Sequence, residues 1–490
     1  MIRRILPLVL LIFFSGRIFS QSTTFVESGF SLANGKQMPF WLRANQNGIY
    51  PLNANSYMVY AGANFEKYNG DSAKVRKSFK AVGEIIGRTT LSNQSIVIPQ
   101  AYIAAKVGVF ELMTGRRREN FGLCDSTGLS SGSFVFSGNA LPMYKLQVGI
   151  PEYVNIAGKG VVAIKGAFTH GWFDNKGYAK DVFLHQKYIF GRIFKTTSKV
   201  QLFGGFTHQV QWGGYPSENL SDFYVINGKF PSSLLAYKYV VTGKSLNLLT
   251  PEQQSKFPLN DAGNRVGNHL GTVDLATFLN FKKISLLFYR QSYYEDGGLF
   301  YLNNIADGLN GVSIQVKNSQ KKFYFKSIVL EFLNTKSQGG TGGSDNTDPF
   351  LRGGDNYFNH GQFRDGWSYN GNTIGTPFIT PSIATKETLP KLSDIFFNNT
   401  RVNVYHAAFN TIVNQKTSVI IKFSKSYNFG IYGLPFPANT NQTSVMLQVL
   451  HPFETKQYGK FQLKAMVGLD NGKLYDNTTG FYLGVRKVWE

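Results

Sequence analysis

The sequence predicts an all-β fold, a transmembrane antiparallel outer-membrane β-barrel of about 18 strands with long extracellular loops. Three observations predict it: apolar and polar residues alternate in short segments, the gaps between segments are alternately short and long, and the chain opens with an export leader. In residues 417–427, for example, Val419, Ile421 and Phe423 alternate with polar residues such as Lys422. Because side chains alternate across a strand, each such segment has one apolar and one polar face.

About 18 segments carry this alternation, and their length of about 10 residues suits strands that cross a bilayer. They are residues 25–33, 57–68, 78–91, 96–106, 109–118, 143–150, 160–172, 182–193, 198–211, 270–281, 284–294, 310–318, 322–334, 400–413, 417–427, 443–452, 459–469 and 479–489. An even number of strands places both chain ends on the periplasmic side.

The gaps between these segments give a second test of the topology. Short gaps occur at residues 107–108, 194–197, 282–283, 319–321, 414–416 and 453–458. Long gaps occur at residues 34–56, 119–142, 212–269, 295–309, 335–399 and 428–442. Outer-membrane barrels have short periplasmic turns and long outer loops, so we expect 212–269 and 335–399 to face the cell exterior. We also expect the long loops and the polar lumen residues to fill the channel, without a separate plug domain and without a pore of general-porin size.

The first residues have the features of a cleaved signal peptide, which we assign to residues 1–20. Arg3 and Arg4 precede an apolar run at residues 5–14, and small residues follow before Gln21. The apolar run is too short to cross a bilayer as a helix. We therefore expect export to the Gram-negative outer membrane, with residues 21–490 forming a single barrel domain.

The formal net charge of +22 indicates an anionic neighbour. Nucleic acid is excluded for an exported chain, which leaves an acidic polysaccharide or the anionic lipopolysaccharide leaflet. The plainer alternative is that Lys and Arg are spread along the lumen and the lipid rim. Both interpretations apply to Arg116 and Arg117. These side chains could bind an acidic sugar or a lipid phosphate, or they could brace the lumen wall.

The two longest gaps mix aromatic rings, carboxylates and amides. Aromatic rings stack on the apolar face of a sugar, while acids and amides bond its hydroxyls. The candidate polysaccharide-binding residues are Trp212, Asp355, Asn356, Tyr357, His360, Asp365, Trp367 and Tyr369, together with Arg116 and Arg117. A Ca²⁺ site at Asp345, Asp348 and Asp355 is an alternative to a solvated acidic loop, which we favour because the spacing is not that of an EF-hand; we expect no metal and no cofactor.

Two histidine-containing segments have alternative readings of their own. His170 and Trp172 share the register of Phe168, which favours a ring of aromatics at the membrane interface over a sugar platform. His185 and Lys187 share the register of Asp181, which we assign to the lumen-facing side, so a polar structural network inside the barrel is expected.

Several short motifs together resemble the Wzi capsule-assembly family, in its Bacteroidetes-like form. They are TGRR at 114–117, SGNA at 137–140, LHQK at 184–187, WGG at 212–214, DGLNG at 307–311, DNYFN at 355–359 and GWSY at 366–369. The resemblance implies an outer-membrane lectin that binds or organises capsular polysaccharide at the cell surface, and we expect a monomer.

Two other function classes remain open. A diffusion channel is the first alternative, since a barrel of this width ordinarily leaves an aqueous lumen. An enzyme acting on glycans is the second, but no GxSxG, HExxH or CxxC framework is present and we expect no catalytic residues.

Overall fold

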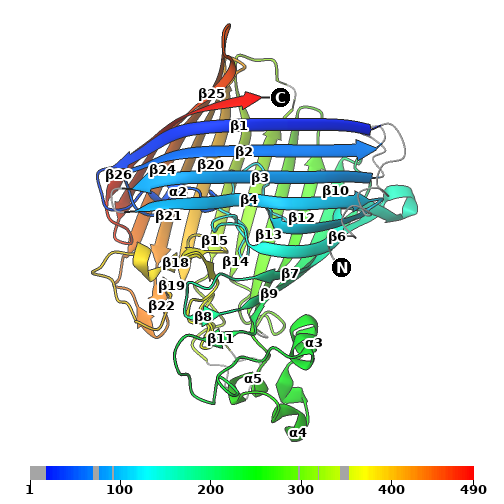
Figure 1. The fold of residues 1–490 in the computed structure, drawn as a ribbon, viewed down its shortest axis with the longest axis vertical. Helices are drawn as coiled ribbons and strands as arrows, with labels where there is room; N and C mark the ends of the chain where they lie inside the picture. The colour runs from blue at the N-terminus through cyan, green and yellow to red at the C-terminus, as the bar shows by residue number, and fades with distance from the viewer. Residues whose placement is uncertain are drawn as a thin grey trace.

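The computed structural model describes residues 18–69, 77–90, 93–295, 298–317, 319–342 and 353–489. It is a closed antiparallel barrel of 18 strands, which confirms the predicted fold class (Figure 1). The strands are β1 (Ile18–Ala33), β2 (Ser56–Asn69), β3 (Lys77–Thr90), β4 (Gln94–Val107), β5 (Phe110–Arg116), β6 (Tyr144–Ala157), β7 (Val162–Trp172), β9 (Phe183–Ile193), β10 (Val200–Trp212), β12 (Asn268–Asn280), β13 (Ile284–Glu295), β14 (Gly308–Val316), β15 (Phe323–Asn334), β20 (Val402–Val413), β21 (Thr417–Asn428), β24 (Asn441–Thr455), β25 (Gly459–Gly472) and β26 (Thr478–Trp489). β1 pairs with both β2 and β26, and this closes the barrel.

Each predicted segment corresponds to one of these strands, with two notable differences in length. β6 extends to Ala157, beyond the predicted end at 150, because register shifts after Ile150 interrupt the alternation that defined it. β1 begins at Ile18, where it pairs with Asn69, so it includes the last residues assigned to the leader. Residues 1–17 lie outside the described residues, and the signal peptide stays a prediction.

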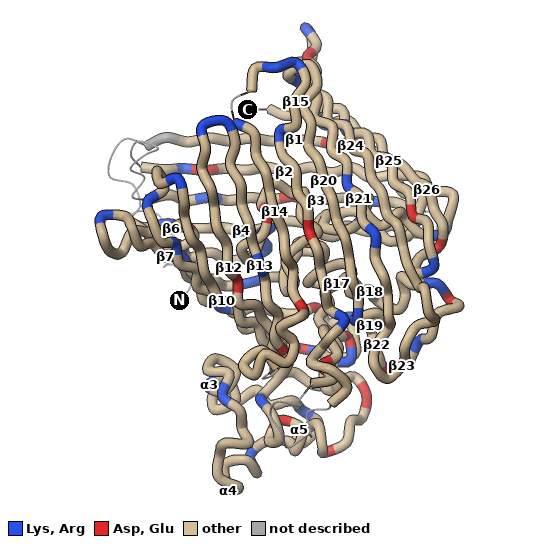
Figure 2. Tube along the Cα trace, turned by 180° about the vertical axis from the view of Figure 1, so that it is seen from behind, with Lys and Arg blue, Asp and Glu red and all other residues tan. Residues whose placement is uncertain are grey.

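The strand connections alternate in length as predicted, except that 91–93 and 473–477, which belong to the end with the long loops, are also short. Connections such as 158–161, 281–283 and 414–416 are short, whereas 213–267 and 335–401 at the other end are long. Lys and Arg gather on the short turns (Figure 2), for example in 281–283 and in the turn after β14. These turns lie at the end of the barrel opposite the long loops.

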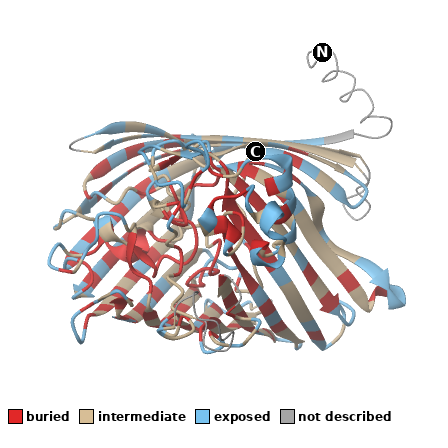
Figure 3. Ribbon diagram, turned by 90° about the horizontal axis from the view of Figure 1, so that it is seen from below, coloured by how far each residue is buried: buried red, intermediate tan, exposed pale blue. Residues whose placement is uncertain are grey.

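Three of the long loops fold into the lumen and fill it with an apolar core. They are residues 34–55, which contain helix α2 (Phe40–Arg43), residues 117–143 and the described parts of the third loop, residues 335–342 and 353–401. Trp41, Phe134 and Trp367 are at most 1% exposed within this core. The ring of Phe134 stacks on Tyr293 of β13 with ring centroids 3.6 Å apart. The buried segments inside the barrel are visible in Figure 3.

Polar side chains of the wall tie these loops in place. The Trp41 indole N–H donates to Ser424 Oγ at 3.0 Å, and the backbone N–H of Phe40 donates to Asp470 Oδ2 at 2.8 Å. Glu331 accepts from the hydroxyl of Ser130 and the backbone N–H of Ser131, both at 2.6 Å. Wall carboxylates and hydroxyls thus satisfy loop donors that the lumen core would otherwise leave without water.

The loop 213–267 turns the other way and packs on the outside of the wall. It carries helices α3 (Leu234–Thr242), α4 (Pro251–Gln254) and α5 (Leu259–Ala262), which project from the barrel in Figure 1. The side chain of Ser233 caps α3 by accepting from the N–H of Ala236, and Gly243, at φ +66°, ends it. Val240 of this helix is fully buried in a cluster with Val210 and Trp212 of β10.

The prediction that His185 and Lys187 face the lumen is wrong. They lie on the same side of β9 as Ile189 and Ile193, which are 54% and 48% exposed on the outer surface. β9 begins at Phe183, after Asp181 has taken a left-handed φ of +52°, so the face of Asp181 does not carry over into the strand. Trp172 lies on the outer surface too, and is 42% exposed.

The outer loops also contain short two-stranded ladders. They are β8 (Ala179–Lys180) with β11 (Tyr215–Pro216), β16 (Ser368–Tyr369) with β17 (Asn372–Thr373), β18 (Thr380–Pro381) with β19 (Phe397–Asn399), and β22 (Gly430–Ile431) with β23 (Leu434–Pro435). Within the described ranges, none of the helices has both the length and the apolar character needed to cross a membrane.

Candidate functional site

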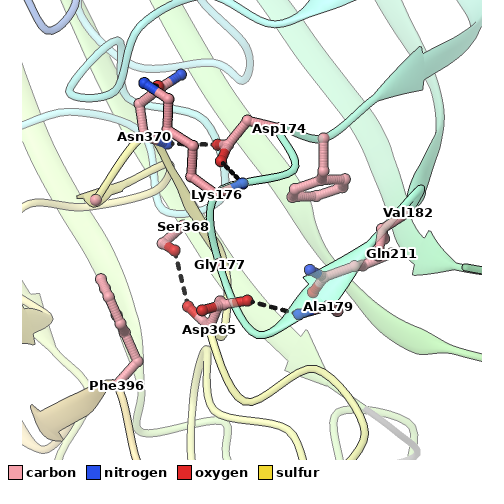
Figure 4. A pocket seen from close by; sticks show the side chains of 12 residues that line it. Asp174, Lys176, Gly177, Ala179, Val182, Gln211, Asp365, Ser368, Asn370 and Phe396 are labelled. Carbon is pink, nitrogen blue, oxygen red and sulfur yellow. Dashed lines mark hydrogen bonds between the residues drawn. The ribbon is translucent and has the colours of Figure 1, made fainter. Parts of the chain in front are cut away.

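A cleft of about 360 Å³ opens between two outer loops, the β7–β9 connection and residues 365–371 (Figure 4). Its lining combines aromatic rings with carboxylate, amide, hydroxyl and ammonium groups. The lining residues are Phe173, Asp174, Lys176, Gly177, Ala179, Val182, Gln211, Asp365, Ser368, Asn370, Gly371 and Phe396.

Asp174 joins the two sides of the cleft. Its carboxylate accepts from the backbone N–H of Asn370 at 2.7 Å and from that of Lys176 at 3.0 Å. The ammonium of Lys176, an exposed side chain, donates to Asn370 Oδ1 at 3.1 Å. These bonds hold one carboxylate, one amide and one ammonium group together at the mouth of the cleft (Figure 4).

Asp365 makes the second link between the two loops. Its carboxylate accepts from the backbone N–H of Ala179 at 3.1 Å, and its carbonyl accepts from the hydroxyl of Ser368 at 2.8 Å. A Cβ at Gly177 would collide with this carboxylate, so a larger residue there would require the Asp365 side chain to move.

The inner end of the cleft holds an amide oxygen without a partner. Gln211, near the end of β10, is 3% exposed, and no hydrogen bond reaches its Oε1 atom. Phe173 and Phe396, which are partly buried, also line the cleft. A ligand that carries hydroxyl groups on an apolar ring could donate to the Gln211 oxygen while it packs on these aromatic rings.

Of the ten residues predicted for the site, only Asp365 lines this cleft. Trp367 and Tyr357 are 0% exposed in the lumen core. The indole N–H of Trp367 donates to the carbonyl of Val135 at 2.7 Å, and the hydroxyl of Tyr357 donates to Asp307 Oδ2 at 2.9 Å. In this conformation neither ring has a free face on which a sugar could stack.

Tyr369 is also buried, and it is paired with Arg116. The Arg116 guanidinium donates to the Tyr369 hydroxyl at 2.8 Å and lies 4.0 Å from the ring centroid of Tyr144. Burial raises the pKa of Tyr369 to about 12, so its hydroxyl stays protonated at neutral pH. The Arg117 guanidinium lies between the carboxylates of Glu111 and Glu119, at 2.6 and 2.9 Å. This arrangement fits the second role considered from the sequence, in which the arginine braces the lumen wall.

The remaining predicted residues are spread over separate places. Asn356 accepts from the hydroxyl of Thr400 at 3.1 Å, and Asp355 donates its backbone N–H to the carbonyl of Gln338. The ring of His360 lies 5.4 Å from that of Phe363. Trp212 is 5% exposed under helix α3 on the outer wall. Asp345 and Asp348 lie outside the described residues.

Sequence reasoning missed the β7–β9 connection, which contributes Asp174 and Lys176. A signal for it was present, because Phe173, Asp174, Asn175 and Gly177 repeat the mixture of aromatic ring, carboxylate, amide and glycine seen in the longer loops. The connection is short, so loop length alone does not mark it as a functional loop.

Comparison with known proteins supports the architecture. No protein-family model matches the sequence, and no curated protein matches it either. Among solved structures, the chain is similar to Wzi of Escherichia coli, described as an outer-membrane, carbohydrate-binding β-barrel involved in group 1 capsule assembly. The TM-score is 0.57 at 13% identity, covering 95% of this chain and 84% of Wzi.

A second group of solved structures includes OccK5 (OpdH) of Pseudomonas aeruginosa, with a TM-score of 0.45, 9% identity and coverage of 96% of this chain and 97% of that one. OccAB2 of Acinetobacter baumannii gives a TM-score of 0.46, 7% identity and coverage of 96% and 98%. At these identities the similarity concerns the fold alone. The chain therefore has the fold of an outer-membrane β-barrel, the same fold as Wzi.

Proposed function

We propose that this protein is an outer-membrane, lectin-like barrel that holds capsular or other surface polysaccharide through the cleft between the β7–β9 connection and residues 365–371. The observation that carries the proposal is the chemistry of the cleft: the unpartnered Gln211 oxygen, the Asp174, Lys176 and Asn370 groups, and adjacent aromatic rings. Hydroxyl donors and acceptors on a ring with an apolar face suit this lining.

Three further points support a binding role. An apolar core, and not a channel for solutes, occupies the lumen of the described barrel. This favours a binding role over a diffusion channel. The Asp174 and Asp365 carboxylates are both engaged by backbone N–H groups that fix them in place, an arrangement suited to binding rather than to catalysis. The carbohydrate-binding description of Wzi agrees with the proposal. The monomeric state and the Bacteroidetes-like form of the family stay predictions.

The test is polysaccharide binding by purified protein, measured by calorimetry with capsular oligosaccharides and by retention of capsule on cells. Lys176→Gln removes a charged donor from the mouth of the cleft, and a hydrogen bond to a charged group is worth about 1.5–3 kcal/mol, so affinity should fall about tenfold or more. Lys180→Gln is the matched control, because Lys180 lies in the same connection but not in the cleft lining.

Gln211→Leu should also weaken binding, while conductance in planar bilayers stays low in all three proteins. Equal affinity of the Lys176→Gln and Lys180→Gln proteins for every glycan tested would contradict the proposal. Large, stable currents from the wild-type protein would support a diffusion channel instead.

A further inference from the structure

The outer wall beneath helix α3 carries polar side chains where a barrel normally presents apolar ones to lipid. His170 of β7, His185 and Lys187 of β9, His208 of β10 and His269 of β12 all have the outward register of their strands. Neighbouring outward positions on the same strands are apolar and exposed, as Ile189 and Leu275 show at 54% and 63%. The polar residues form one patch near the long-loop end of the wall, with the rings of His208 and His269 5.1 Å apart.

Helix α3 covers this patch. The ammonium of Lys187 donates to the carbonyl of Val241, and the ring of Tyr237 lies 6.0 Å from that of His185 and 5.1 Å from that of Trp212. Val240 is fully buried against the same wall. The helix therefore takes the position beside these strands that lipid or its head groups take elsewhere around the barrel.

The length of the strands places this helix at the level of the membrane. β9 has 11 residues, about the number that a tilted strand needs to cross the hydrocarbon layer. Its exposed apolar positions run only from Ile189 to Ile193, about 10 Å along the membrane normal at a tilt of about 45°. On β26 the exposed apolar positions run from Phe481 to Trp489, about 20 Å, close to the expected band of about 25 Å.

The surface of α3 that faces away from the wall has the composition of an interfacial helix. Ala236, Tyr239 and Val240 face the barrel, whereas Leu234 and Leu235 on the opposite side are 88% and 39% exposed. Exposed lysines accompany these leucines and the exposed Leu248 and Leu259 of the same lobe. These lysines are Lys238, Lys244 and Lys256. Apolar side chains beside lysines are the pattern of a helix that lies in the boundary of an anionic membrane.

We propose that α3 completes the lipid-facing band of the barrel in this sector and binds the anionic lipid of the outer leaflet. Leu234 and Leu235 insert among the acyl chains, and Lys238 and Lys244 pair with the lipid phosphates. The ligand is a phosphorylated amphiphile of the lipopolysaccharide type. The inference rests on the barrel fold and the position of α3, and not on the polysaccharide cleft.

The first experiment measures where α3 lies relative to lipid. In a Cys124→Ala background, the fluorophore NBD is attached at Leu234→Cys and, as the matched control, at Ile383→Cys, which is 68% exposed on an inward-folded outer loop. Both proteins are reconstituted in vesicles that contain lipopolysaccharide and nitroxide-labelled phospholipid. We expect the label at 234 to be quenched by the nitroxide lipid at least about threefold more than the label at 383. Equal lipid quenching at the two sites, or stronger quenching at 234 by aqueous iodide, overturns the proposal.

The second experiment measures the charge contribution. Lys238→Glu should lower affinity for lipopolysaccharide by about fivefold or more, whereas Lys473→Glu, an exposed lysine beside β26, should change it less. Binding of lipopolysaccharide should shift the emission of the NBD label at position 234. Inorganic phosphate at the same phosphate concentration should not reproduce this shift, because it lacks acyl chains. If phosphate alone reproduces the shift, or if both charge reversals act equally, the site is not a lipid site. Folding of each variant is checked by the heat-dependent gel shift of the barrel.

Discussion

Three long outer loops of this barrel turn into the lumen, whereas the loop 213–267 turns onto the outer wall. The inward loops place Trp41, Phe134 and Trp367 inside a wall of carboxylates, amides and hydroxyls. The outward loop places Val240 and Tyr237 over a wall patch that contains histidines and a lysine. The inward loops place an apolar core against the polar lumen face of the wall. The outward loop covers polar side chains on the outer face of the wall. Each kind of loop should therefore respond to its own substitutions, with the largest effect in the lumen core.

Among the substitutions considered, replacement of Trp367 should lower the stability of the lumen core most. Replacing it with alanine removes a fully buried indole and its 2.7 Å hydrogen bond to Val135, at a cost of about 3–5 kcal/mol in the free energy of unfolding of the loop core. Urea unfolding followed by aromatic fluorescence measures the loss, and conductance in planar bilayers should rise as the loops loosen. Trp172→Ala, on the outer surface, is the control and should leave conductance unchanged. An unchanged unfolding midpoint for Trp367→Ala would mean that the inward loops do not form one core.

Attachment of the outward loop to the barrel wall should depend on Val240, but with a smaller loss of free energy. Val240→Ala removes part of a fully buried side chain, and burial of valine contributes about 1.5–3 kcal/mol, so attachment of the lobe should weaken by about 1–2 kcal/mol. The measurement is the rate of protease cleavage within 213–267 on intact cells, which should rise while conductance stays low. Thr242→Ala, exposed on the same helix, serves as the control. A rise in conductance in the Val240→Ala protein would show that the two kinds of loop are not independent.

Asp261 connects the two loops and should make the attachment depend on pH. It is 0% exposed, and its carboxylate accepts from Gln362 Nε2 at 2.7 Å and from the backbone N–H of Gly267 at 3.1 Å. Burial raises the pKa of Asp261 to about 7 from the ordinary 3.8. The folded state therefore holds the proton more tightly than the open state, and attachment weakens as pH rises from about 4 to 7 and is constant above that.

Protease cleavage of 213–267 should accordingly be several-fold slower at pH 5 than at pH 8, and Asp261→Asn should abolish this difference. Asp222→Asn, an exposed acid in the same loop, is the matched control and should keep it. A wild-type cleavage rate that does not vary between pH 5 and 8, measured with a protease active throughout that range, would contradict the prediction.

Tyr369→Phe should have the smallest effect. It removes the 2.8 Å hydrogen bond from Arg116 but leaves the Arg116 guanidinium over the ring of Tyr144. The free energy of unfolding should fall by about 1 kcal/mol, the usual net value of one hydrogen bond. Tyr427→Phe, whose ring is exposed on the outer wall, gives the background value. A loss as large as that of Trp367→Ala would mean that this pair at the rim, and not the aromatic core, holds the inward loops.

The sequence alone determined the strands and the direction of the chain through them. Side chains alternate across a strand with a period of two, and this local rule places one face against lipid at each segment, so the 18 strands and the alternating gaps could be predicted without tertiary contacts. It did not determine the face of His185 and Lys187, because Asp181 interrupts the alternation just before β9 begins. The side on which a residue lies can be inferred from a neighbouring residue only within one continuous strand.

Only the tertiary structure decided which loop residues form the cleft and which form the core. Trp367 and Tyr357 have the composition of a sugar site, but the same mixture of rings, acids and amides also builds a core that bonds to a polar wall. The distinction depends on whether a loop turns into the barrel, which is set by contacts far apart in sequence. The cleft itself joins Asp174 to Asn370 across 196 residues of chain, and no local pattern in either segment encodes that meeting, because each depends on the barrel to bring it to the other.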